Sequence, residues 1–199
     1  MAVLGAGCLV STAVPATTIG FGGLAAGTPF TGYTQDGFTV APVSEVWSVN
    51  EYGAPGPSIV FVDSQGVGGQ AFSVTVTRAG EAFTFGAIDL YSSVTPIPYT
   101  LLGTLSGRTV FSASGTVPNT FGNFATVLST DAKADIDRLE VTLTTVRILV
   151  SSNPYGIDNI VVSATAAPVP EAASLWLLAS ALAALGVARP GWVLRRSPG

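Results

Sequence analysis

Apolar and polar residues alternate with a period of two along much of the chain between residues 17 and 164. Between residues 72 and 77, Phe and Val alternate with Ser and Thr, and between residues 138 and 144, Leu and Val alternate with Arg, Glu and Thr. This alternation predicts antiparallel strands with one face toward a core and the other toward water. Further strand-like runs lie at residues 37–41, 45–49, 58–62, 82–91, 99–105, 108–114, 121–128, 145–150 and 155–163.

Clusters of Gly, Pro, Asn and Ser separate these runs, for example at residues 53–57 and 151–154. Such clusters mark turns. The only helix-like stretch of this segment, residues 131–137, has room for a single turn. Many short strands without a helical layer predict an all-β fold. We therefore expect an antiparallel β-sandwich, a jelly roll, over residues 17–166.

The composition excludes several classes of enzyme. The chain has 199 residues, which suits one domain with tails, and it has no His and a single Cys, Cys8. Without His there is no Ser-His-Asp or Cys-His machinery and no His-ligated metal. With one Cys there is neither a disulfide framework nor a thiolate zinc cluster.

Charge is scarce and unevenly distributed. Charged residues make up 10% of the chain, against about 25% in a typical soluble protein. Between residues 17 and 168, eleven Asp and Glu residues outnumber five Lys and Arg residues. Such an acidic body repels phosphate backbones, so we expect no binding of nucleic acid.

The tail, residues 167–199, has a different pattern. Val-Pro-Glu at residues 169–171 precedes 17 uncharged residues, 172–188, that are mostly Ala and Leu. As a helix this segment is about 25 Å long, close to the ~30 Å of a bilayer core. The end segment, residues 189–199, contains three basic residues, Arg189, Arg195 and Arg196. Basic residues beside a membrane helix favour the cytoplasmic side, which places the body on the outside. The alternative is a buried C-terminal helix of the domain.

This order of motif, hydrophobic helix and Arg-containing end resembles the PEP-CTERM sorting signal of Gram-negative bacteria that make extracellular polysaccharide. In that family an exosortase, an integral-membrane protease, recognises the signal and cleaves near the Pro-Glu pair. The resemblance implies that Val169, Pro170 and Glu171 are recognised by such an enzyme. It also implies transient anchoring in the inner membrane, followed by transfer to the cell envelope or the extracellular matrix. One departure is Ala172, where the family usually has Pro.

Residues 1–16 have part of an export signal. A short apolar run at 2–10 precedes two candidate small-residue cleavage sites, 11–13 and 14–16, but no Lys or Arg precedes the run. We therefore expect a partial or truncated signal peptide, with the true start upstream or with Met1 an internal or misassigned start. Cys8 is then a small apolar residue in a removed segment.

The body resembles the secreted jelly-roll domains that commonly precede PEP-CTERM tails and that are similar to carbohydrate-binding modules. The segments that support this resemblance are residues 83–90, 103–107, 121–124 and 156–162. In that superfamily the closing Ile-Asp-Asp/Asn strand pairs near the first strand, and its Asp often helps to hold a structural calcium. The resemblance therefore implies Asp158 as a metal ligand, although Gly22 occupies a position where such modules frequently have an acid.

The residues around Asp158 leave two interpretations open. Ile157 and Ile160 are three apart in a strand of period two, which predicts a bulge at Asp158 and Asn159. At such a bulge, both side chains either bind local backbone donors or contribute oxygen atoms to calcium. The first interpretation is favoured, and no cofactor is required. Further acids near turns are Asp36, Asp63 and Asp89.

Sugar binding by a sandwich needs exposed aromatic rings flanked by polar groups. The candidates are Trp47, Tyr52 and Tyr155. Trp47 shares a strand face with Val49, which favours a place in the core. Tyr52 and Tyr155 lie beside turns rich in Gly and Pro, so we expect them to be exposed. Tyr91 and Tyr99 are further aromatic residues of the right type.

A glycosidase needs only two carboxylates about 5–9.5 Å apart. The acids that suggest one, in a single short segment, are Asp131, Asp135, Asp137 and Glu140. Interleaved with Lys133 and Arg138, they fit a solvated turn better. We predict no catalytic residue and no enzyme activity.

Two main functions remain, with a carboxylate-dependent glycosidase as a remote alternative. The body either binds the cell's own extracellular polysaccharide, or it is a structural matrix or surface-coat protein without a small ligand. An aromatic strip on an exposed face favours the first, and an apolar edge strand or self-association favours the second.

Overall fold

The computed structural model describes residues 15–44, 46–51, 56–64, 66–119, 121, 123–149 and 152–165. These residues belong to one compact unit, which ends at Thr165. The second unit, residues 166–199, lies outside the described residues, as does nearly all of the predicted signal segment. The sorting motif, the hydrophobic helix and the three tail arginines therefore stay predictions. In the part of the chain described, no helix long and apolar enough to span a membrane is present.

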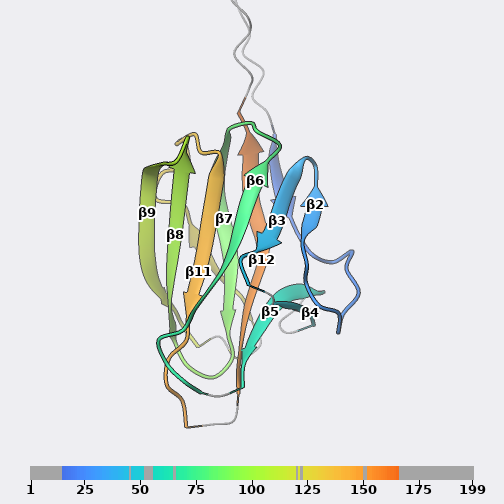
Figure 1. The fold of residues 1–199 in the computed structure, drawn as a ribbon, viewed down its shortest axis with the longest axis vertical. Coiled ribbons are helices and arrows are strands. Elements are labelled where there is room, and N and C mark those ends of the chain that lie inside the picture. The colour runs from blue at the N-terminus through green and yellow to red at the C-terminus, as the bar shows by residue number, and fades with distance from the viewer. Residues whose placement is uncertain are drawn as a thin grey trace, which may run out of the picture. The chain divides into compact units, whose positions relative to one another are not determined.

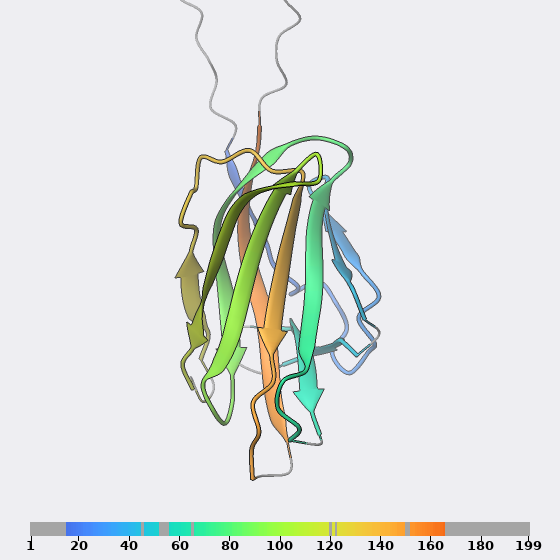
Figure 2. The ribbon, with the colours of Figure 1, turned by 60° about the vertical axis from the view of Figure 1, so that its left-hand side comes forward.

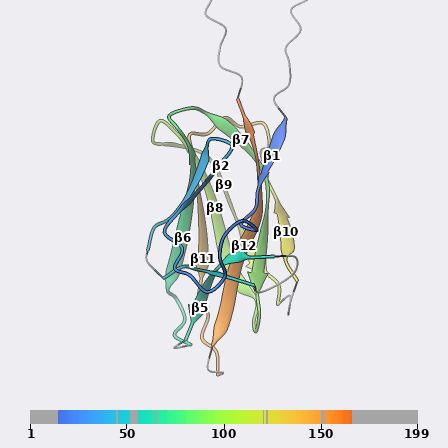
Figure 3. The same ribbon diagram turned by 90° about the vertical axis from the view of Figure 1, so that its right-hand side faces the viewer.

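The described residues form two sheets in which every pairing is antiparallel (Figures 1 and 2). The first sheet has the order β10-β7-β12-β5-β4, with β1 paired to β12 (Figure 3). Its strands are β1 (Ala16–Ile19), β4 (Ser48–Asn50), β5 (Ser58–Asp63), β7 (Phe83–Ser92), β10 (Ala125–Leu128) and β12 (Asn153–Ala164). The second sheet has the order β2-β3-β6-β11-β8-β9. Its strands are β2 (Tyr33–Gln35), β3 (Phe38–Pro42), β6 (Ala71–Arg78), β8 (Ile97–Leu105), β9 (Arg108–Val117) and β11 (Arg138–Thr144).

The core lies between the two sheets, as the alternating pattern predicts. On β6, Val74 and Val76 are buried, and on the neighbouring β11, Leu139 and Val141 are buried opposite them. The polar residues between them face away from the core because successive side chains of a strand point to opposite faces. The all-β, antiparallel sandwich predicted from the sequence is confirmed for the body.

One predicted strand is wrong. Residues 145–149 do not pair with a neighbouring strand, because their backbone forms hydrogen bonds with the loop between β5 and β6 instead. Thr145 exchanges backbone bonds of 2.8 Å with Gln70 and Gly69, and its hydroxyl donates to the Val67 carbonyl at 2.7 Å. The two loops are thereby joined at one end of the sandwich. The single turn expected at residues 131–137 is present, with a bond from the Ala134 N–H to the Asp131 carbonyl.

Candidate functional site

The bulge predicted at Asp158 and Asn159 is confirmed. The register of β12 against β7 shifts between Asp158 and Val161, and Asn159 has a positive φ of 45°. Asn tolerates this left-handed conformation better than most residues, because its short side chain bonds locally. Here the bulge turns the Asn159 side-chain amide toward Asp89, whose carboxylate accepts from it at 2.9 Å.

Asp158 is buried at this bulge, with 5% of its surface exposed. Its Oδ1 accepts the backbone N–H of Asn159 at 2.8 Å. Burial raises the pKa of Asp158, the backbone N–H groups of Asn159 and Phe21 oppose that shift, and the charge of Asp89 adds to it. The local backbone bonds are those that the favoured interpretation of the bulge predicts.

Calcium prefers six to eight oxygen ligands, usually with several carboxylates. The structure places Asp89 opposite Asp158, and Asp89 also accepts the Thr126 hydroxyl at 2.6 Å. Asp36 lies instead in the turn between β2 and β3, and Asp63 ends β5. Within the described ranges, no three acidic, His or Cys residues cluster as a metal site would need. Calcium binding through Asp158 stays the less favoured of the two interpretations of the bulge.

Two of the three aromatic candidates, Trp47 and Tyr155, are buried and do not lie on an exposed face. Trp47 is 1% exposed and packs near Phe61, which confirms its expected place in the core. Tyr155 is also 1% exposed, so its expected exposure is wrong. The reason is that β12 already begins at Asn153, and Tyr155 is paired with Phe61 on one side and Ser92 on the other. Tyr52 lies outside the described residues.

Phe61 on β5 and Phe72 on β6, which the sequence analysis did not identify as site residues, line a hollow beside Trp47 and Tyr155. We call it the Phe61 pocket; its volume is about 250 Å³, and its lining includes Val46, Phe61, Asp63, Ser64, Gln70 and Phe72. The rings of Phe61 and Phe72 stack with centroids 3.8 Å apart, and Tyr155 stacks on Phe61 at 5.8 Å. The pocket therefore combines aromatic rings with a carboxylate and an amide.

Local bonds hold the polar rim of the Phe61 pocket in place. The Asp63 carboxylate accepts the Gly66 N–H at 2.9 Å, which fixes the start of the loop between β5 and β6. The Gln70 N–H donates to the Thr145 hydroxyl at 3.0 Å, while the residue itself is exposed. Burial raises the pKa of the Tyr155 phenol beneath Phe61, Asn153 and the Val146 backbone oppose that shift, and the Asp63 charge adds to it.

Two larger hollows of about 520 Å³ lack this combination. One is formed by Gly66–Gly68 and residues 147–149, with Arg147 as its charged group, and the other by Pro29, Phe30, Thr31 and Pro42. Neither joins an aromatic ring to a charged side chain. Of these hollows, the Phe61 pocket is the best candidate for sugar binding.

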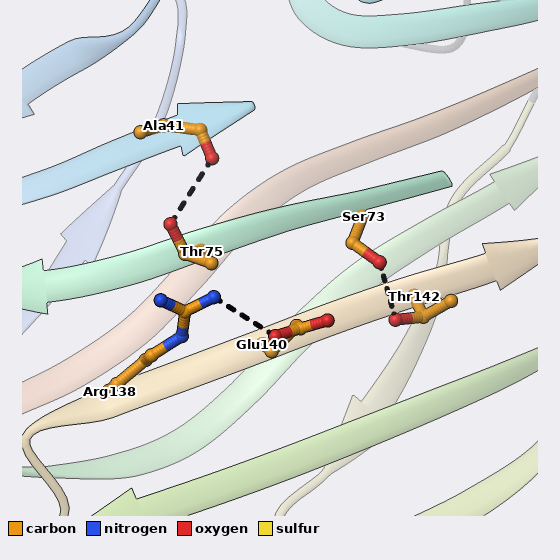
Figure 4. Close-up of polar contacts among 6 residues, drawn as sticks. All are labelled: Ala41, Ser73, Thr75, Arg138, Glu140 and Thr142. Carbon is orange, nitrogen blue, oxygen red and sulfur yellow. Dashed lines mark hydrogen bonds and ion pairs between the residues drawn. The ribbon is translucent and has the colours of Figure 1, made fainter. Parts of the chain in front are cut away.

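The outer face of the second sheet is covered by hydroxyl groups, and we call it the hydroxyl face. Ser73 and Thr142 bond across β6 and β11 at 2.7 Å, and Arg138, at the start of β11, bonds Glu140 at 3.0 Å (Figure 4). Strand register places the other members on the same side; they are Thr34, Thr39, Thr75, Thr77, Thr100, Thr104, Ser112, Ser114 and Thr116. Among the described residues, the face has no aromatic strip.

The acidic segment after β10 has separate local partners. Asp137 accepts the Ser106 N–H at 2.6 Å, Asp135 accepts the Thr165 hydroxyl at 2.8 Å, and Glu140 pairs with Arg138. Asp131 begins the single turn and is exposed. These contacts fit the solvated turn that the sequence predicts, and the absence of catalysis stays a prediction.

No family model matches the chain, and no curated protein matches it. Similar solved structures include a family 29 carbohydrate-binding module from Piromyces equi, with 9% identity over 77% of this chain and 93% of that one, at a TM-score of 0.45. A second is a carbohydrate-binding module of family 61 in complex with β-1,4-galactotriose, with 9% identity over 65% and 90% of the two chains and a TM-score of 0.38. A third is the enzymatically active domain of bacteriophage CBA120 tailspike protein 4, with 16% identity over 65% and 20% and a TM-score of 0.41.

Proposed function

We propose that this protein is exported and that its jelly-roll body binds extracellular polysaccharide at the Phe61 pocket. The observation that supports this proposal is the stacked pair of Phe61 and Phe72 beside Asp63 and Gln70. The C–H groups on the face of a sugar ring pack on aromatic rings, while its hydroxyls need directed acceptors and donors. Phe72, which is half-buried, offers the ring face, because Phe61 is itself stacked between Phe72 and Tyr155. A carboxylate and an amide supply both kinds of partner.

The size of the pocket restricts the mode of binding. At about 250 Å³ it is smaller than the ~300–1,000 Å³ typical of drug-sized ligands. We infer that one sugar unit of a polymer enters the pocket, while neighbouring units lie along the adjacent surface.

We also propose a route by which the protein reaches its ligand. The Val169-Pro170-Glu171 motif, the segment 172–188 and the arginines after it are the proposed signal for an exosortase-type membrane protease. The chain is anchored in the inner membrane for a time and is then passed to the cell envelope or the matrix.

The test is co-sedimentation of the full chain, held in mild detergent, with insoluble polysaccharide from the producing organism. We expect saturable binding that weakens at least about tenfold in both Phe72→Ala and Gln70→Ala. Gln70→Ala is the milder variant, because Gln70 is exposed and its structural bond uses the backbone. The matched control is Phe121→Ala, which removes a ring that is 81% exposed and does not line this pocket. Equal binding by all four proteins, or no binding by any, contradicts the proposal.

The second candidate function is that of a structural matrix or surface-coat protein without a small ligand. The observation that favours it is the long, uncharged edge of the second sheet, residues 111–117 of β9. A glycosidase remains the remote alternative, and it needs two acids that converge on one sugar.

A further inference from the structure

The second sheet ends at β9, and this edge is long. β9 has ten residues, Arg108–Val117, and pairs with β8 on one side only (Figure 1). No strand in the described part of the chain pairs with its other side. The backbone N–H and C=O groups on the open side of an edge strand can pair with another strand.

The other sheet edges are short or held by local contacts. β2 has three residues, and the Gln35 side chain at its end donates to the Thr18 carbonyl at 3.0 Å and accepts from Gly20. β10 has four residues. β4 has three, and Val49 within it exchanges backbone bonds with Gly27 and Thr28. Among the edges described, β9 is therefore the one long enough for an extended ladder.

Most of β9 also lacks the features that prevent edge pairing. Charged residues, prolines and bulges usually protect such an edge. The one irregularity is at Val110, because Gly103 pairs with Phe111 while the next residue of β8 pairs with Thr109. From Phe111 to Val117 the strand is regular and has neither charge nor proline.

We propose that two copies of this chain associate by antiparallel pairing of residues 111–117 of β9. A two-fold axis at Ser114 pairs Ser112 of each copy with Thr116 of the other, and Ala113 with Gly115. This register uses the whole regular segment, and every pair off the axis is made twice, as a two-fold interface requires. Two six-stranded sheets then become one of twelve strands.

The side chains of this segment suit a second copy of the same strand. Ser112, Ser114 and Thr116 are exposed on the hydroxyl face, so their small polar groups stay in water after pairing. On the other face, Phe111 and Val117 are already buried, and the register places them opposite each other. No like charges meet along the paired segment, although the whole chain has a net charge of −4. The association does not depend on the Phe61 pocket, which lies at β5 and β6.

The test introduces charged residues at Ser112 and Thr116, which the register places opposite each other. Association of the full chain is then measured by sedimentation equilibrium in density-matched detergent. S112K/T116K places like charges opposite each other twice, whereas S112K/T116E places opposite charges there. Directly opposed like charges destabilise a strand pair and opposite charges stabilise it. We expect a wild-type dimer, a dissociation constant at least about fivefold higher for S112K/T116K, and a constant near the wild-type value for S112K/T116E.

The matched control is T31K/T34K, which adds the same two charges at exposed positions in and just before β2, at the opposite edge of the second sheet from β9. It should dimerise like the wild type, and far-UV circular dichroism should show that all variants are folded. A wild-type monomer at every concentration overturns the proposal. It is also overturned if the two β9 variants associate equally, because the partner strand then does not lie in this register.

Discussion

Asp158 on β12 lies directly opposite Asp89 on β7, and Asn159 bonds both carboxylates. Its backbone N–H donates to Asp158 at 2.8 Å, and its side-chain amide donates to Asp89 at 2.9 Å. The bulge makes both bonds possible, because it turns the backbone N–H of Asn159 toward Asp158 and its side-chain amide toward Asp89. Two carboxylates are thus held side by side by protein donors, with Asp158 the more buried of the two.

This arrangement predicts a stability that depends on pH. The pKa of Asp158 in the folded protein is raised above 3.8, mainly by burial. The folded state therefore holds this proton more tightly than the unfolded chain, so the group's contribution to stability is present below pH 3.8 and is lost as the pH rises through the folded pKa. Asp158→Asn, which keeps an acceptor for the Asn159 N–H, should remove this loss. Urea unfolding between pH 3.5 and 7 measures the free energy of unfolding of both proteins. If this free energy changes with pH in the same way in the wild type and in Asp158→Asn, the prediction is contradicted.

Calcium should leave the stability of the wild-type body unchanged. The two acids at the bulge already bind Asn159 and Thr126. We expect the Tm of the full chain in millimolar Ca²⁺ and in chelator to agree within about 1 °C, because a ligand adds negligible stability when its concentration is far below its Kd. A higher Tm in Ca²⁺ that disappears in Asp158→Asn contradicts this expectation and identifies a calcium site.

The sequence predicted features whose cause is local. The alternation in β6 and β11 predicted the core face, and the spacing of Ile157 and Ile160 predicted the bulge. Tyr155 was misplaced because nearby Pro and Ser residues suggest a turn, whereas its burial follows from pairing with strands far along the chain.

The Phe61 pocket was missed for a similar reason. Phe61 and Phe72 belong to different sheets, and each fits the pattern of an ordinary core residue. Only the packing of the two sheets brings their rings together beside Asp63. No local pattern in the sequence predicts that contact.

Two glycines of the second sheet lie under aromatic rings, and we expect substitution there to destabilise the fold. Phe111 covers Gly103, its cross-strand partner, and Tyr99 covers Gly115 in the same way. A methyl group at Gly103 would overlap the Phe111 ring, so Gly103→Ala should lower the free energy of unfolding by about 1–3 kcal/mol. The control is Gly22→Ala, where the added carbon meets open space and the change should stay within about 0.5 kcal/mol. Equal effects in urea unfolding would show that the ring moves aside without cost.

Tyr155 should ionise at higher pH than an exposed tyrosine. Burial raises the pKa of its phenol above 10.0, with the Asp63 charge adding to the shift. Because the folded state disfavours the phenolate, the contribution of this group to stability is present below pH 10 and is lost as the pH rises through the folded pKa. Absorbance titration near 295 nm should show a late component that disappears in Tyr155→Phe. The same component should persist in Tyr33→Phe, a half-buried tyrosine on β2. If Tyr155→Phe instead removes a component that titrates at the lower pH of exposed tyrosines, the Tyr155 ring is open to water and could itself serve as a sugar platform.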